Sequence, residues 1–214
     1  MKSKIQSLKN GNKKTVIKKL FLTAAVAVSS LTFAQQFGAK AGMNVSTISD
    51  EGFDDTKSKV GYYAGVFMNV PVSESFSIQP EVLYNNLGSK VSSTVSGTTY
   101  SSTLNLDYVA VPVMFQYKAT PQFYLEAGPE FGFLVNAKQK FDDGSSSTVT
   151  ELDKEDFNSF NMGVGLGLGF DISKNVGLNA RYVAGFSDIT KESGPAADAK
   201  NKNNAFQVGL NIKF

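Results

Sequence analysis

Five charged residues interrupt otherwise apolar or small-residue segments and could carry chemistry. They are Lys40, Glu81, Glu126, Glu130 and Arg181. Two carboxyl groups within about 10 Å of each other can hydrolyse glycosidic bonds. Glu126 and Glu130 lie on one strand-like segment, where about 3.3 Å per residue separates them by about 13 Å. This separation does not favour hydrolysis.

The composition removes other common catalytic groups. The chain has no histidine and no cysteine. It therefore lacks the commonest general base, the commonest metal ligand and any thiol nucleophile. We expect a protein that is not an enzyme, with no catalytic residue, no cofactor and no bound metal.

A cluster of acids could instead bind calcium. Asp50, Glu51, Asp54 and Asp55 offer carboxylate oxygens, which are the ligands that Ca²⁺ prefers. Their spacing matches no EF-hand loop. A solvated polar loop is the favoured interpretation of this cluster.

The stretch NMGVGLGLGFD, residues 161–171, places glycine at positions 163, 165, 167 and 169. A dinucleotide-binding loop requires G-x-G-x-x-G before a helix, but Leu168 occupies the third glycine position and no helical period follows. Apolar residues at every second position are typical of a β-strand. One face of this strand is hydrocarbon, and the glycine face suits a crowded, narrow space.

The same alternation recurs in eight segments. They lie near residues 36–47, 60–70, 76–86, 104–117, 122–135, 160–171, 175–187 and 204–214. A tilted transmembrane strand needs about 9–11 residues. The connections after the second, fourth and sixth segments are short, and the others are long and polar, as in outer-membrane barrels. The pattern predicts an all-β fold: an eight-stranded antiparallel up-and-down transmembrane β-barrel, with the serine-rich second long loop able to extend its strands as a hairpin.

The first 34 residues are typical of a secretory signal peptide. Seven lysines and no acid precede an apolar run of 14 residues, Leu20 to Phe33, which is too short to span a bilayer. Small residues before Gln35 predict cleavage between Ala34 and Gln35. The barrel domain is then 35–214. Its 14 basic and 19 acidic residues give a net charge of −5, which offers no support for nucleic-acid binding.

Two features assign the apolar face to lipid. Six aromatic residues are expected at the short-turn rim, where they would form an interfacial girdle. They are Phe37, Phe76, Tyr117, Phe123, Phe170 and Phe214.

A Lys or Arg on the lipid face costs about 2–4 kcal/mol at mid-bilayer, so the five charged residues are expected inside. There they form either a plug of paired charges or a gate along a narrow ion path. Eight strands leave little room for water, which favours the plug.

Several segments resemble the PorT-like family of small outer-membrane β-barrels. They are LTFAQQ, FGAKAGMN, VGYYAGVFMNVPVSESFSIQPEVLYNNLG, LDYVAVPVMFQY, FYLEAGPEFGFLV and FQVGLNIKF. The most telling are Gln79-Pro80-Glu81 and the run Leu125 to Pro129. The resemblance covers nearly all of 35–214 and implies an eight-stranded barrel in the outer membrane. It implies no defined activity, although one namesake member takes part in protein secretion.

The expected function is an integral outer-membrane protein with a structural or surface-interaction role. Its expected partners are outer-membrane lipid, the barrel-assembly machinery acting on the strand that ends at Phe214, and an unknown ligand or protein at the long loops. Two alternatives stay open: a narrow small-solute channel, and a soluble lipocalin-like binder. The lipocalin alternative requires the apolar face to lie inside the barrel.

Overall fold

The alternating segments form antiparallel strands in the computed structural model, which describes residues 35–49, 57–95, 98–189 and 201–214. The expected signal peptide (1–34), its cleavage site at Ala34 and the acidic cluster at residues 50–55 therefore fall outside the described residues. The strands are β1 (Gln36–Ser49), β2 (Lys57–Pro71), β3 (Phe76–Val95), β4 (Thr98–Lys118), β5 (Phe123–Asp142), β6 (Ser147–Glu151), β7 (Phe160–Asp171), β8 (Val176–Asp188) and β9 (Lys202–Lys213). Among these residues no helix is long and apolar enough to cross a membrane.

The prediction of eight strands is wrong by one, because the sheet has nine. Its order is β4-β3-β2-β1-β9-β8-β7-β5-β6. The extra strand, β6, lies in the third long loop and pairs with Lys138–Asp142 at the end of β5. All five of its residues are exposed. Since β6 buries neither face, its sequence shows no apolar alternation to mark it as a strand.

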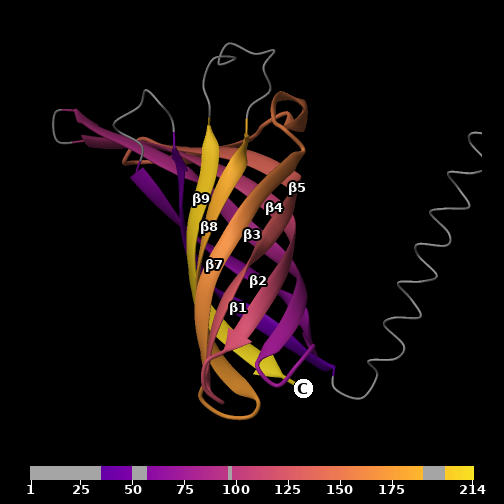
Figure 1. Cartoon of the computed structure of the whole chain (residues 1–214). Helices are drawn as coiled ribbons and strands as arrows, with labels where there is room; N and C mark the ends of the chain where they lie inside the picture. Colours follow the sequence, from indigo (N-terminus) through magenta and orange to yellow (C-terminus); the bar gives the residue numbers. More distant parts are fainter. Residues whose placement is uncertain (1–34, 50–56, 96–97, 190–200) are drawn as a thin grey trace, which may run out of the picture. The chain divides into compact units, whose positions relative to one another are not determined.

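The other eight strands pair all the way round. β4 pairs with β3 on one side and with β5 on the other, in addition to the linear order of the sheet. β1 pairs with both β2 and β9. The strands curve around a common interior (Figure 1), which we call the lumen.

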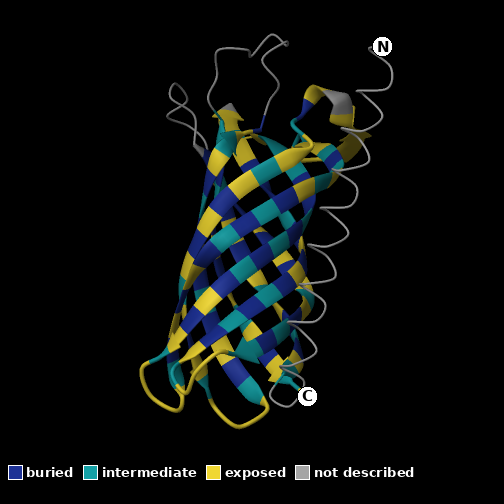
Figure 2. Cartoon of the chain, turned by 45° about the vertical axis from the view of Figure 1, so that its right-hand side comes forward, coloured by how far each residue is buried: buried dark blue, intermediate teal, exposed yellow. Residues whose placement is uncertain are grey.

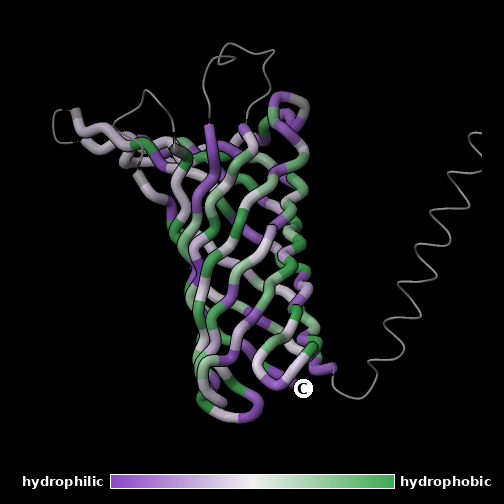
Figure 3. The backbone as a smooth tube through the Cα atoms, in the orientation of Figure 1, coloured by the Kyte–Doolittle hydropathy of each residue, from purple (hydrophilic) through white to green (hydrophobic). Residues whose placement is uncertain are grey.

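The apolar face of the strands points outward. Leu166 is 65% exposed, whereas Gly165 and Gly169 on the same strand are buried. Buried and exposed residues alternate along the strands (Figure 2), and so do hydrophilic and hydrophobic ones (Figure 3). A lipocalin-like binder would need the reverse arrangement, so the structure counts against that alternative.

The short-turn rim has a repeated local structure. In each short turn a side-chain hydroxyl accepts a hydrogen bond from the backbone N–H three residues later. The hydroxyls belong to Ser73, Thr120 and Ser173. The donors are Phe76, Phe123 and Val176, at 3.1, 2.9 and 3.1 Å respectively. These local hydrogen bonds from backbone to side chain, which are typical of Ser and Thr, close the three turns.

The expected aromatic girdle lies at this same rim. Phe76 pairs with Tyr117 across β3 and β4, with ring centroids 5.0 Å apart, and Phe123 pairs with Phe170. The Phe214 N–H donates to the Phe37 carbonyl at 2.8 Å. Five of the six side chains are exposed, and Phe123 is half-buried.

At the opposite end, β3, β4, β5 and β6 extend beyond the other strands as a largely hydrophilic sheet (Figure 3). The expected hairpin extension of the serine-rich second loop is confirmed, since pairing continues to Val95 and Thr98. The β5–β6 turn is held by Asp143, which accepts N–H bonds from Ser146 and Ser145 at 2.7 and 2.9 Å. These bonds lower the pKa of the Asp143 carboxyl below its usual value.

Candidate functional site: the luminal polar network

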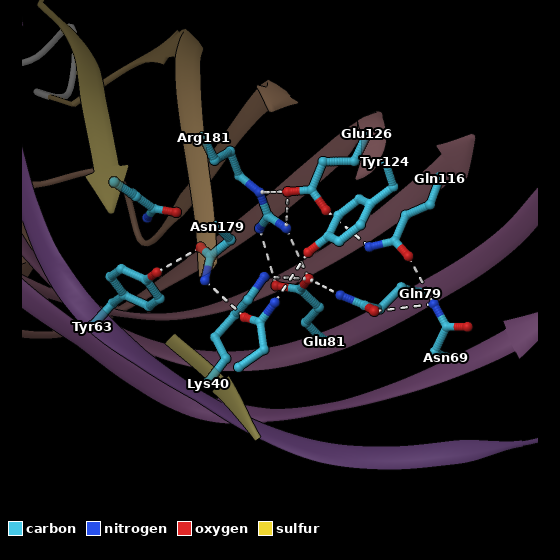
Figure 4. A network of polar contacts seen from close by, with 12 residues as sticks. Lys40, Tyr63, Asn69, Gln79, Glu81, Gln116, Tyr124, Glu126, Asn179 and Arg181 are labelled. Carbon is cyan, nitrogen blue, oxygen red and sulfur yellow. Dashed lines mark hydrogen bonds and ion pairs between the residues drawn. The ribbon is translucent and has the colours of Figure 1, made fainter. Parts of the chain in front are cut away.

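Four of the five predicted charged residues meet in the lumen. They come from four strands: Lys40 from β1, Glu81 from β3, Glu126 from β5 and Arg181 from β8. All four are 1–2% exposed. Each lies on the inward side of its strand because the residues before and after it carry the hydrocarbon that faces outward. We call these four residues the ion-paired cluster (Figure 4).

Arg181 is the centre of the cluster. Its Nη1 and Nη2 donate to the two oxygens of Glu81 at 3.0 and 2.8 Å, and its Nε donates to Glu126 Oε1 at 2.8 Å. Lys40 Nζ lies 2.9 Å from Glu81 Oε1. The two cations and two carboxylates balance, which offsets the large desolvation cost of burying four charges.

The contact between Arg181 and Glu81 crosses the lumen. In the order of pairing, β8 and β3 are four strands apart whichever way round the sheet is followed. Two neutral bonds join other distant strands: the Tyr63 hydroxyl donates to Asn179 Oδ1 at 2.8 Å, and Asn211 Nδ2 donates to the Tyr124 hydroxyl at 3.0 Å. Side-chain hydrogen bonds therefore connect distant strands across the lumen.

Amides complete the hydrogen bonding of the carboxylates on the short-turn side. Gln79 Nε2 donates to Glu81 Oε1 at 2.8 Å, and Gln116 Nε2 donates to Glu126 Oε2 at 3.0 Å. Asn69 Nδ2 in turn donates to Gln79 Oε1 and Gln116 Oε1, at 3.1 and 2.8 Å. Both oxygens of each carboxylate therefore have partners. These amides were not among the predicted site residues, and the signal that could have found them is their place on the same inward faces as the charged residues.

The glycines of β7 make room for the network. A Cβ on Gly169 would lie 2.0 Å from Cζ of Tyr124, and one on Gly167 would lie 3.0 Å from Glu126 Oε1. The glycine face of β7 is therefore the wall against which Tyr124, Glu126 and Arg181 pack. Because these glycines lie within a β-strand, they do not form a dinucleotide-binding loop.

Glu130, the fifth predicted charge, is buried but does not join the cluster. Its Oε2 has no hydrogen-bond partner within the described part of the chain. It lines a cavity of about 20 Å³ together with Tyr108, Asn161 and Asn203, each of which also presents an unpartnered polar atom. The space is the size of one water molecule, and its lining offers both donors and acceptors.

An apolar cluster fills the lumen nearer the long loops. It joins strand residues to Phe157 and Ile189 from the loop segments. Its buried members are Ile48, Leu87, Leu106, Tyr108, Ala137, Phe157, Ile189 and Ala205. The Asn158 N–H donates to the Ile189 carbonyl at 2.8 Å, which ties the two loop segments together. The Glu130 cavity therefore lies between the ion-paired cluster and an apolar lid formed by these residues.

An apolar exterior, a filled polar interior and an aromatic rim are together typical of an outer-membrane β-barrel. The chain belongs to the outer membrane protein beta-barrel domain family, whose family model matches residues 33–191. Its location is the outer membrane, where its outward face contacts lipid.

One solved structure supports this fold, and a second is reported for comparison. Ail, the attachment invasion locus protein of Yersinia pestis, is 14% identical, with 85% of this chain and 100% of that chain covered and a TM-score of 0.51. Neisserial surface protein A is 12% identical over 85% of this chain and 99% of that chain, with a TM-score of 0.47. Identities this low indicate a shared fold alone. The curated proteins contain no significant match.

Proposed function

We propose that the eight long strands form a closed transmembrane barrel whose lumen is plugged, and that the protein serves a structural or surface-interaction role without catalysis. The observation that carries the proposal is the bidentate contact of Arg181 with Glu81 across the lumen. Opening a path there would separate buried opposite charges, and breaking a buried pair costs about 3–5 kcal/mol. The cluster is therefore suited to hold the lumen shut.

The non-catalytic part of the proposal rests on how the carboxylates are used. A general acid or base needs an oxygen that can reach a substrate proton. The oxygens of Glu81 and Glu126 are instead engaged by Arg181, Lys40 and amides. The Glu130 carboxylate lies in a cavity with room for about one water, which is too small for a substrate.

The proposed interaction surface is the loop-side sheet of β3, β4, β5 and β6. Loops and strand ends on a rigid barrel are where binding residues concentrate, and β6 presents an exposed strand to any partner. We further propose membership of the PorT-like group, on the sequence resemblance, and recognition of β9 and Phe214 by the barrel-assembly machinery. A pull-down from native membranes with and without residues 139–151 tests for a partner of this sheet.

Conductance across a planar lipid bilayer tests the plug. The purified protein, confirmed as folded by heat-modifiable gel migration, is expected to give no discrete current steps. Uniform steps from the unaltered protein would contradict the plug and establish the small-solute channel instead. The matched comparison is the Glu81→Ala/Arg181→Ala double variant, which removes the central contact with no change in net charge and is expected to conduct.

A further inference from the structure

A lysine-lined pocket opens on the outer surface at the loop-side end of the barrel. It has a volume of about 720 Å³ and is formed by β1, β2, β3, β4 and β5. Its polar lining includes Lys59, Lys90, Thr103, Asn105 and Lys140. Among the described residues, no acidic side chain lines it. The pocket is separate from the luminal network, because Lys90 and Lys140 are exposed side chains outside the barrel.

The strand register gathers positive charge here. Lys90 pairs with Thr103, and Thr103 pairs with Lys140. These three residues form a row across β3, β4 and β5, with the two lysines on either side of Thr103.

Lys59, the remaining lysine of the pocket, already has polar partners within the protein. Lys59 is buried and donates to the Leu87 carbonyl at 3.1 Å and to Asn86 Oδ1. Asn86 Nδ2 donates onward to Asp107 Oδ1 at 2.5 Å. By contrast, the counter-charge found for Lys140 is Asp142 at 4.0 Å, the outer limit of an ion pair. Lys90 and Lys140 are therefore the lysines with charge to offer a ligand.

The other border of the pocket is apolar. Met43, Val60 and Tyr62 line it and are 63%, 60% and 55% exposed on the outward face. Tyr62 also stacks on Tyr84, with ring centroids 6.1 Å apart. Aromatic residues of this kind mark the level of lipid headgroups in transmembrane barrels. A ligand that satisfies both borders has an anionic head and a hydrocarbon tail.

We propose that this pocket binds the phosphate-bearing headgroup of a lipid in the membrane leaflet on the long-loop side. The Lys90 and Lys140 ammonium groups contact the phosphate, since lysine is a common phosphate ligand. Thr103 and Asn105 supply neutral hydrogen bonds, and the acyl chains lie along Met43, Val60 and Tyr62. The inference depends on the outer-membrane location but not on whether the lumen conducts.

Native mass spectrometry of the full chain tests the site. The protein is reconstituted in bilayers of phosphatidylcholine with a minor fraction of phosphatidic acid, extracted in mild detergent, and the retained lipids are counted. Lys90→Gln/Lys140→Gln is expected to retain at least about threefold less phosphatidic acid than the unaltered protein. Lys118→Gln/Lys174→Gln makes the same charge change at the short-turn rim and is expected to retain it fully.

Three results would overturn the proposal. Equal retention by the pocket variant would show that these lysines do not bind the lipid. An equal loss in both variants would show unspecific charge attraction. Displacement of phosphatidic acid by an equal concentration of inorganic phosphate would show a free-anion site. Gel migration of each variant verifies folding, and Lys90→Arg/Lys140→Arg, which preserves charge, is expected to restore retention.

Discussion

At the scale of single residues, Arg181 and Glu130 show how differently two buried charges can be treated. Arg181 contacts two carboxylates from different strands, Glu81 and Glu126. Glu130 lies in the same lumen, and its Oε2 has no hydrogen-bond partner among the described residues. A buried charge with partners is costly to break apart, whereas one without partners is a source of instability.

Substitution with glutamine is therefore expected to have opposite consequences at the two positions. Arg181→Gln leaves two carboxylates short of a cation and should lower the free energy of unfolding by about 3–5 kcal/mol. Glu130→Gln keeps the shape, removes an unpaired charge and should leave stability unchanged or raised. Urea unfolding in detergent micelles measures both, with exposed Lys174→Gln as the control. An equal loss from Arg181→Gln and Glu130→Gln would contradict this account of the lumen.

At the scale of elements, β7 shows why its alternating glycines are needed. Its outward residues face lipid, and its inward side must admit the Tyr124 ring, which would lie 2.0 Å from a Cβ on Gly169. The pairing of Gly169 with Tyr124 across β7 and β5 fixes this approach. A strand of ordinary residues would fill the space that the network occupies.

Gly169→Ala is expected to destabilise the barrel through overpacking, by about 1–3 kcal/mol. Tyr124→Ala empties the same space, so the double variant should lose less stability than the sum of the two single variants. Urea unfolding of all four proteins gives this coupling. Simple additivity would show that the glycine is not required by the ring. Gly132→Ala is a milder control, since its nearest neighbour would be a Tyr108 side-chain atom at 3.3 Å.

At the scale of the whole molecule, position relative to the lipid decides what a surface residue tolerates. Leu166 and Phe141 are both apolar strand residues, 65% and 50% exposed. Leu166 lies in the middle of β7, within the outward apolar face, and Phe141 lies on β5 in the loop-side sheet. Only Leu166 is expected to contact acyl chains.

Leu166→Arg is therefore expected to cost about 2–4 kcal/mol in a bilayer. Phe141→Arg places the same charge in water, opposite the neutral Ser102 and Thr148, and should stay within about 0.5 kcal/mol of the unaltered protein. Folding yield and urea stability in phosphatidylcholine vesicles measure both. Equal tolerance at the two positions would contradict a lipid-facing exterior.

The alternating pattern was enough to predict the long strands, their inward and outward faces and the inward direction of the five charged residues. A period of two is a local signal, and one slipped residue would expose every charge to lipid. It also placed the aromatic rim and the paired extension of β3 and β4. The alternation did not reveal β6, because a strand that is solvated on both faces needs no apolar pattern.

Which charges meet could not be read from the pattern and follows from the three-dimensional arrangement of the strands. Lys40, Glu81, Glu126 and Arg181 come from four strands, and their contacts depend on strand tilt and stagger around the barrel, which no single strand encodes. Glu130 carries the same inward signal as Glu126, yet it lies outside the ion-paired cluster. The approach of Lys90 and Lys140 to Thr103 on the outer surface likewise depends on the register between β3, β4 and β5. Alternation assigns each residue to a face, and the pairing of the strands around the lumen decides which residues come into contact.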